Sequence, residues 1–405
     1  MRSRLSICYA APGHTLVSTA GSARNILSLA EALSHWADVT VAFRSICEPV
    51  KTGRINVVSI EPREEAVGAR MDDVAARGLN PLSHLAYVRL LKSFAQQWAR
   101  SFDVVLEKGW RLSGTLAALF RAQGVPGLLV ENDVRYWHEP IRGVRAMARY
   151  AMHGLAQGVA GYASRRMPLI IAETDELKTM LIQQRHIAAE QVEVIGLGVD
   201  HRLFYPMTQD EARRALGICS EACVLLYVGG LDMYHDLGPL LQACSQAEQP
   251  ELEIHIVGNG EYRSNYEAKA RQTRVPVVFH GQQPHHRVPT FIGASDLCLA
   301  PYRVDAFPNQ LVPFSTLKIP EYMACARPVV SVPSGHIQTL IEDQQTGFLV
   351  PNAVSAWHAF LRQLPDRHGL AAMGTRAAHA VASVSWENTA AQYLEASRSL
   401  IASRD

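Results

Sequence analysis

Short apolar runs alternate with segments of helical period along the whole chain, and this alternation constrains the fold more than any other feature. Strands of a parallel sheet are buried on both faces, so they read as near-continuous apolar runs, and the helices between them cover those faces. The sequence therefore predicts an α/β fold. The expected strands are residues 5–10, 38–43, 55–60, 103–108, 127–132, 168–173 and 192–197 in the first half, and 223–230, 252–260, 276–281, 296–302, 327–332 and 347–351 in the second.

The two series of strands predict two domains. A chain of 405 residues exceeds what one hydrophobic core usually organises. We expect two Rossmann-like, doubly wound domains that join near residues 202–207 and face each other across a cleft. Ligands of such sheets lie beyond the carboxyl ends of the strands, so this cleft is the expected site.

The composition excludes several classes of protein. Hydrophobic residues make up 48% of the chain and charged residues 19%, which is the balance of a folded globular protein. There are 39 basic residues (Lys and Arg) against 38 acidic ones, so the chain lacks the basic excess that nucleic-acid binding requires. The seven cysteines are an odd number and most lie in apolar runs, which favours reduced thiols and a cytoplasmic location. No run of about 18 apolar residues predicts a membrane span.

Residues 135–166 form a basic segment of helical period. It contains six arginines, and Glu139 is the acidic residue that opposes them. Two interpretations stay open: peripheral contact with the inner face of a membrane, or an ordinary solvated helix face.

Glycines follow several of the expected strands, among them Gly21, Gly230 and Gly258. A glycine at a strand end lets backbone amides approach a phosphate, because no Cβ stands in the way. Tight turns between strands and helices also need glycine, so each position alone is a weak signal. Together they suggest an anionic ligand.

The segment PFSTLKIPEYMACARPVV, residues 313–330, combines a cap, a cation and a carboxylate. Ser315 is the expected N-cap of a helix that begins at Thr316, where free amides and the helix dipole favour a diphosphate. Lys318 in the first turn suits a helix start only if an anion is present, and Glu321 lies on the same face for sugar hydroxyls. The alternative is a simple surface pair of Lys318 and Glu321, worth about 0.2–0.5 kcal/mol.

This segment resembles the SPLKxxEYMAxGxPVV motif of the family 4 retaining glycosyltransferases, which have the GT-B fold. Other segments resemble the family in the same order along nearly the whole chain. They are the glycine-rich loop and helix AGSARNILSLAEAL (20–33), the hinge VEVIGLGVDHRLFYP (192–206), the segment LLYVGGLDMYHDLGPLLQA (225–243), and the final helix SWENTAAQYLEA (385–396) that returns to the first domain.

The resemblance implies an acceptor domain, residues 1–204 completed by a helix at 386–403, and a nucleotide-sugar donor domain, residues 205–385. It implies transfer of a hexose-type sugar from a UDP- or GDP-linked donor to a glycan, a lipid-linked or another acceptor, with retention and with neither a metal nor a cofactor. The implied donor-binding residues are Gly21, Ser22, Gly230, His235, Gly258, Gly281, Gln282, Ser315, Thr316, Leu317, Lys318 and Glu321. Expected catalytic residues are Glu131, His138 and Lys318, and expected acceptor or sugar contacts are Glu107 and Asn132.

Departures from the family pattern leave alternatives open. Gly230 stands where many relatives have arginine, Pro313 replaces a glutamate that contacts the donor sugar, and Leu197 replaces the hinge asparagine. A nucleotide-sugar-binding partner without catalysis and a nucleotide-sugar epimerase are therefore the competing functions. Near Glu131, helix capping by Asn132 or Asp133 is the alternative to a role in catalysis.

Overall fold

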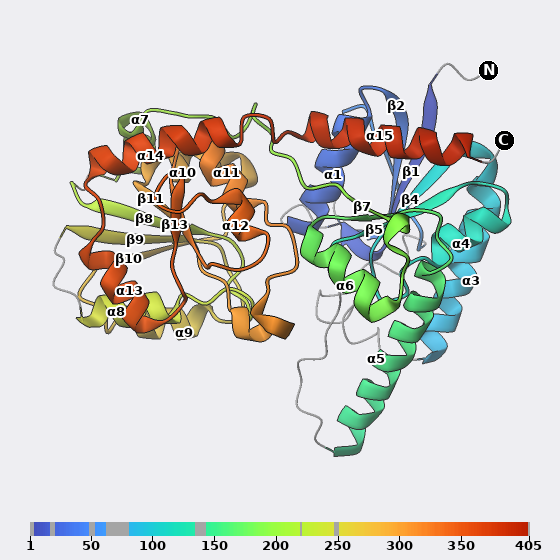
Figure 1. Cartoon of the computed structure of the whole chain (residues 1–405), viewed down its shortest axis with the longest axis horizontal. Coiled ribbons are helices and arrows are strands. Elements are labelled where there is room, and N and C mark those ends of the chain that lie inside the picture. The colour runs from blue at the N-terminus through green and yellow to red at the C-terminus, as the bar shows by residue number, and fades with distance from the viewer. Residues whose placement is uncertain are drawn as a thin grey trace. The chain divides into compact units, whose positions relative to one another are not determined.

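The fold is described from a computed structural model, which covers residues 4–16, 21–47, 53–61, 81–133, 143–218, 221–246 and 251–403. The chain divides into two compact units. Unit 1 is Met1–Leu197 with Trp386–Asp405, and unit 2 is Gly198–Ser385. Each unit is built on its own parallel sheet with helices on its faces (Figure 1).

Unit 1 contains a sheet of seven parallel strands in the order β3-β2-β1-β4-β5-β6-β7. The strands are β1 (Leu5–Leu16), β2 (Ala37–Ile46), β3 (Asn56–Ser59), β4 (Val104–Lys108), β5 (Gly127–Glu131), β6 (Ile170–Ala172) and β7 (Val192–Val194). The described helices are α1 (Gly21–Leu33), α3 (Pro81–Trp98), α4 (Thr115–Ala122), α5 (Gly143–Ser164), α6 (Asp175–Arg185) and α15 (Trp386–Ala402). Helix α15 packs against α1, so the end of the chain belongs to unit 1.

Unit 2 contains a sheet of six parallel strands in the order β10-β9-β8-β11-β12-β13. The strands are β8 (Cys223–Val228), β9 (Leu252–Val257), β10 (Val277–Gly281), β11 (Leu297–Ala300), β12 (Val329–Ser331) and β13 (Gly347–Leu349). The helices are α7 (Gln209–Leu216), α8 (Gly238–Gln246), α9 (Arg263–Ala270), α10 (Val288–Ala294), α11 (Lys318–Ala324), α12 (Ile337–Leu340), α13 (Val354–Arg362) and α14 (Arg367–Ala380).

The α/β fold class predicted from the sequence is confirmed, with two Rossmann-like parallel sheets. Each expected strand coincides with an observed one, because the central strands are buried on both faces. In β4, for example, Val104, Val105 and Leu106 are fully buried. The structure differs at the junction: Val199 and Phe204, which we assigned to the first domain, are buried in the core of unit 2. The compact units therefore divide at residue 197 rather than 204.

Part of the basic segment at residues 135–166 forms helix α5, which begins at Gly143. Residues 134–142 lie outside the described part of the chain. None of the helices in the described ranges is both apolar and long enough to cross a membrane.

Candidate functional site

Three neighbouring strands of unit 2 end in glycines. The carboxyl ends of these strands form one edge of the sheet, which we call the glycine edge. Gly229 follows β8, Gly258 follows β9, and Gly281 ends β10. The amide of Gly258 donates to the Gly281 carbonyl at 2.8 Å. A Cβ on Gly258 would lie 1.9 Å from the Gly229 carbonyl oxygen, and its φ of +141° disfavours other residues. Glycine therefore lets the backbones of these strand ends pack closely, and these three positions place no side chain at this edge.

Lys318 directs its ammonium group toward this edge. Its Nζ lies 3.4 Å from the Tyr227 hydroxyl, 4.6 Å from the centre of the Tyr227 ring and 5.5 Å from that of Tyr302. A Cβ placed on Gly229 would lie 2.8 Å from Nζ. Burial lowers the pKa of Lys318 to about 7, although the carboxylate of Asp232 opposes this shift. The alternative of an exposed Lys–Glu surface pair does not describe this lysine.

His235 lies beside Lys318 and is held by Asp232. Its Nδ1 is 2.9 Å from Asp232 Oδ1. Burial, together with the charge of Lys318, lowers the pKa of His235 to about 4, so the ring is neutral at pH 7. Burial raises the pKa of Asp232, but its hydrogen bonds with His235 and Tyr234 and the charges of His235 and Lys318 outweigh this effect and lower it overall.

The contact with Asp232 decides which nitrogen of neutral His235 carries the proton. An ionised carboxylate only accepts hydrogen bonds, so Nδ1 is the protonated nitrogen and Nε2 has a lone pair. The resemblance implies that His235 binds the donor, and a neutral histidine can donate one hydrogen bond, through its protonated nitrogen. The structure commits that donor to Asp232, so Nε2 donates only when the ring is charged.

The start of α11 corrects the prediction for residues 315–317. The helix begins at Lys318 with Leu317 at the N-cap position, so Ser315 is not the cap. Thr316 is buried and precedes the helix, and its Oγ1 lies 2.5 Å from the Tyr302 hydroxyl. Pro320 in the first turn has no N–H group, which removes one of the free amides that we expected for a diphosphate.

Glu321 is largely buried in the first turn of α11, with a side chain 15% exposed. Its Oε1 lies 3.9 Å from Nε2 of His285, a residue that our sequence reasoning did not single out. Gln282 follows β10 and is exposed. Gly230 is exposed, and its carbonyl accepts a hydrogen bond from Tyr227 at 2.6 Å.

Lys318, His235 and the strand-end glycines thus come together through Tyr227 and Asp232, which sequence reasoning also missed. The spacing of Asp232 and His235, three residues apart in the turn after β8, was the available signal for the carboxylate. No sequence signal distinguishes Tyr227 from a core aromatic residue, since it is fully buried within β8. In the described ranges, no three His, Cys, Asp or Glu side chains gather as metal ligands would.

Glu107, which we expected to contact an acceptor or a sugar, lies in the interior of unit 1. The residue is fully buried, and its carboxylate accepts hydrogen bonds from Trp110 Nε1 at 2.6 Å and from the amides of Gly114 and Ala117 at 3.0 and 2.7 Å. It therefore satisfies free amides at the start of α4. Burial raises the pKa of Glu107 to about 7, although these hydrogen bonds lower it.

The remaining predicted residues of unit 1 have different surroundings. Glu131 is 1% exposed and lies 2.5 Å from Arg185, which favours a structural ion pair over the expected acceptor base. Asn132 follows β5 and is half-buried, and the described part of α5 begins too far along the chain for Asn132 or Asp133 to cap it. His138 lies outside the described residues.

Gly21 begins α1, and Ser22 is in its first turn; their side chains are not described. This position, just after β1, is the one that the resemblance assigned to a diphosphate-binding loop. The helix start is thus where it was predicted, and the contact with phosphate stays a prediction.

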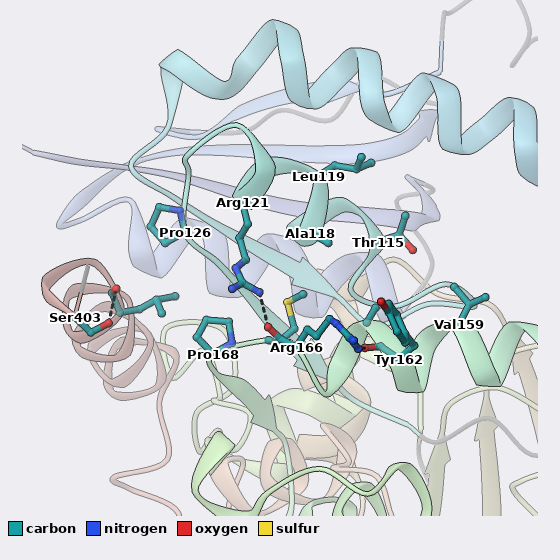
Figure 2. A pocket seen from close by; sticks show the side chains of 13 residues that line it. Thr115, Ala118, Leu119, Arg121, Pro126, Val159, Tyr162, Arg166, Pro168 and Ser403 are labelled. Atoms are coloured by element: carbon teal, nitrogen blue, oxygen red, sulfur yellow. Dashed lines mark hydrogen bonds between the residues drawn. The ribbon is translucent and has the colours of Figure 1, made fainter. Parts of the chain in front are cut away.

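A separate hollow of about 680 Å³ lies elsewhere in unit 1 (Figure 2). It is lined by α4, the end of α5, the end of α15 and the residues just before β5 and β6, including Pro126 and Pro168. It is thus at the amino ends of these strands, whereas ligands of doubly wound sheets lie at the carboxyl ends.

Comparisons with known proteins agree on the family. The family described as "Glycosyl transferases group 1" matches residues 222–366, which include the site in unit 2. A D-inositol 3-phosphate glycosyltransferase of Kribbella flavida is 30% identical over 245 residues, which is 56% of this chain and 56% of the relative. The chain thus matches about half the length of curated relatives at this level of similarity.

Solved structures agree on the fold. A sucrose-phosphate synthase from Thermosynechococcus elongatus superposes with a TM-score of 0.77 at 19% identity, covering 99% of this chain and 100% of that one. Anabaena HepE, solved in complex with UDP-glucose, gives a TM-score of 0.71 at 18% identity, covering 98% and 100% of the two chains. Residues 222–366 thus belong to the group 1 glycosyltransferase family, and the two Rossmann-like units have the GT-B fold of the solved glycosyltransferases.

Proposed function

We propose that the protein transfers a hexose-type sugar from a UDP- or GDP-linked donor to a glycan, a lipid-linked or another acceptor, with retention at the anomeric carbon. The observation that carries the proposal is the half-buried ammonium of Lys318, aimed at the backbone edge formed by Gly229 and Gly258. A leaving nucleoside diphosphate gains negative charge, and a preorganised cation stabilises it more in the transition state than in the ground state.

Other residues take supporting roles in this proposal. Glu321 accepts hydrogen bonds from the donor ribose, and the backbone at Gly281 and Gln282 contacts the base. Gly21 and Ser22 at the start of α1 contact the diphosphate. Unit 1 is then the acceptor domain and unit 2 the donor domain. The complex of HepE with UDP-glucose supports UDP-linked sugars as the first donors to test.

Titration calorimetry with UDP-glucose and GDP-mannose tests donor binding. Lys318→Ala and Glu321→Ala should each weaken binding by about 1–3 kcal/mol, the scale of a lost charge-assisted hydrogen bond. Lys269→Ala, which removes an exposed lysine in α9 of the same unit, is the matched control and should leave binding unchanged. Equal affinities in all three variants would remove the assignment of the site.

Release of nucleoside diphosphate tests transfer itself. Release that depends on the acceptor supports the proposal, and the anomeric configuration of the product reports retention. The name of the Kribbella relative makes phosphorylated polyols a reasonable first set of acceptors. Donor binding without turnover would instead support the inactive partner, and a new sugar isomer without diphosphate release would support the epimerase.

A further inference from the structure

In helix α5 of unit 1 the buried side chains are small, whereas large apolar side chains are exposed to solvent. Most helices of globular proteins bury their large apolar side chains and expose polar ones. In α5 the buried positions are small, namely Ala146, Ala156, Ala160 and Ser164. Several large apolar residues are exposed instead: Val144 (83%), Met147 (61%), Leu155 (62%), Val159 (42%) and Tyr162 (57%), with Tyr150 (48%) beside them.

These exposed residues form one continuous stripe. With the exposed Ala151 between Met147 and Leu155, the spacings from residue 144 through 147, 151, 155, 159 to 162 are three or four residues, which places these six residues on one helix face. At a rise of 1.5 Å per residue, the stripe is about 27 Å long. The first turns of α5 extend beyond the other described helices of unit 1 (Figure 1). A contiguous apolar surface of this kind marks an interaction site.

The charges around the stripe favour an anionic partner. Arg145, Arg149, Arg165 and Arg166 lie on or just after α5, and the sequence has no Asp or Glu between Glu139 and Glu173. A second copy of the chain would bring the same cations to the interface, and like charges repel. A surface of anionic lipids complements both the apolar stripe and its charge.

The stripe ends at the hollow of unit 1, where Arg121 and Arg166 lie close together (Figure 2). Val159 and Tyr162 belong both to the stripe and to the lining of the hollow. The Arg166 guanidinium stacks on the Tyr162 ring, 3.6 Å from its centre, and Arg121 donates to the Arg166 carbonyl. Both arginines are exposed, so their remaining N–H groups face solvent where a phosphate could accept them.

We propose that α5 lies on the surface of an anionic lipid bilayer, with its apolar stripe in the interface and Arg121 and Arg166 at the level of the headgroup phosphates. Tyrosine suits this depth because its ring is apolar and its hydroxyl is polar. The helix lies on the membrane and does not cross it. This inference is independent of sugar transfer, because it rests on unit 1 alone.

Co-sedimentation of the full chain with vesicles tests the proposal without any donor sugar. We expect binding to vesicles that contain phosphatidylglycerol, at least tenfold weaker binding to pure phosphatidylcholine, and weaker binding at high salt. Leu155→Glu with Val159→Glu should reduce binding at least tenfold. A matched pair of single variants, Val159→Glu and the control Val278→Glu at an exposed position of β10, separates the stripe from a general effect of added charge.

Arg121→Gln with Arg166→Gln should remove most of the preference for anionic vesicles. Unfolding temperatures close to that of the wild type would show that the exposed substitutions leave the fold intact. The proposal is overturned if the wild type binds neither kind of vesicle, or if the Leu155/Val159 variant binds as well as the wild type. It is also overturned if sedimentation shows a dimer that this variant dissociates while no vesicle binding is seen, since the stripe would then join two copies.

Discussion

Replacing Lys318 by methionine should make the protein more stable at neutral pH. Burial lowers the pKa of Lys318 from 10.5 to about 7. In the unfolded chain the same lysine stays charged up to about pH 10.5, so the folded state binds fewer protons between these values. The folded state is therefore destabilised fully below pH 7, and this effect disappears as the pH rises to 10.5. The cost is about 4 kcal/mol at pH 7 and less than about 1 kcal/mol at pH 10.

The contact with the Tyr227 ring offsets about 1 kcal/mol of this cost. Lys318→Met retains a flexible stem without the charge, so we expect its free energy of unfolding to exceed that of the wild type by about 3 kcal/mol at pH 7. The gain should nearly vanish at pH 10. Urea denaturation of both proteins at the two pH values measures it, and Lys269→Met, an exposed lysine, is the control. A gain of equal size at both pH values, or none at pH 7, would refute the reasoning.

Three further predictions concern protons, glycine and a buried ion pair. Calorimetry with UDP at pH 8, in buffers of different ionisation enthalpy, should show uptake of about 0.9 proton that Lys318→Met abolishes, because a bound diphosphate restores the charge of the lysine. Gly258→Ala should destabilise unit 2 by more than about 3 kcal/mol, whereas Gly124→Ala, also at positive φ but in open space, should cost only about 1–2 kcal/mol in thermal unfolding. Lys108→Met should cost about 3–5 kcal/mol, because Glu173, 2.6 Å away and buried, loses its partner, and adding Glu173→Gln should recover most of this.

The sheets could be predicted from the sequence because each central strand is buried on both faces. The run Cys223–Val228 is apolar without interruption, and the apolar residues 104–106 of β4 are fully buried, as expected of strands in a parallel sheet. The start of α11 could not be placed in the same way. Ser315 has the side chain of an N-cap, but Thr316 pairs with Tyr302 from a distant strand end, and the helix begins only at Lys318. A contact between segments far apart in the sequence thus displaces a local cap signal.

The candidate site could be predicted only in part for a related reason. A glutamate at a strand end has the same sequence context whether it faces a ligand or the amides of the next helix. Glu107 faces the amides of Gly114 and Ala117, and Glu131 faces Arg185, whose position on α6 depends on how that helix packs. Lys318 was identified because a cation in the first turn of a helix opposes the helix dipole and needs a reason of its own.

The positive charge that an anion would meet at this edge depends on Asp232, which interacts with both His235 and Lys318. Its carboxylate accepts a hydrogen bond from Nδ1 of His235 and raises the pKa of that ring, although burial and the charge of Lys318 outweigh this effect and keep the ring neutral. The same carboxylate raises the pKa of Lys318 against the effect of burial. With Gly230 in place of the arginine of many relatives, the charge state of Lys318 therefore sets how much positive charge meets a diphosphate. Because this lysine is about half protonated near pH 7, donor affinity should fall about tenfold for each pH unit above it. A donor affinity that stays constant from pH 7 to pH 9 would mean that another group neutralises the phosphates.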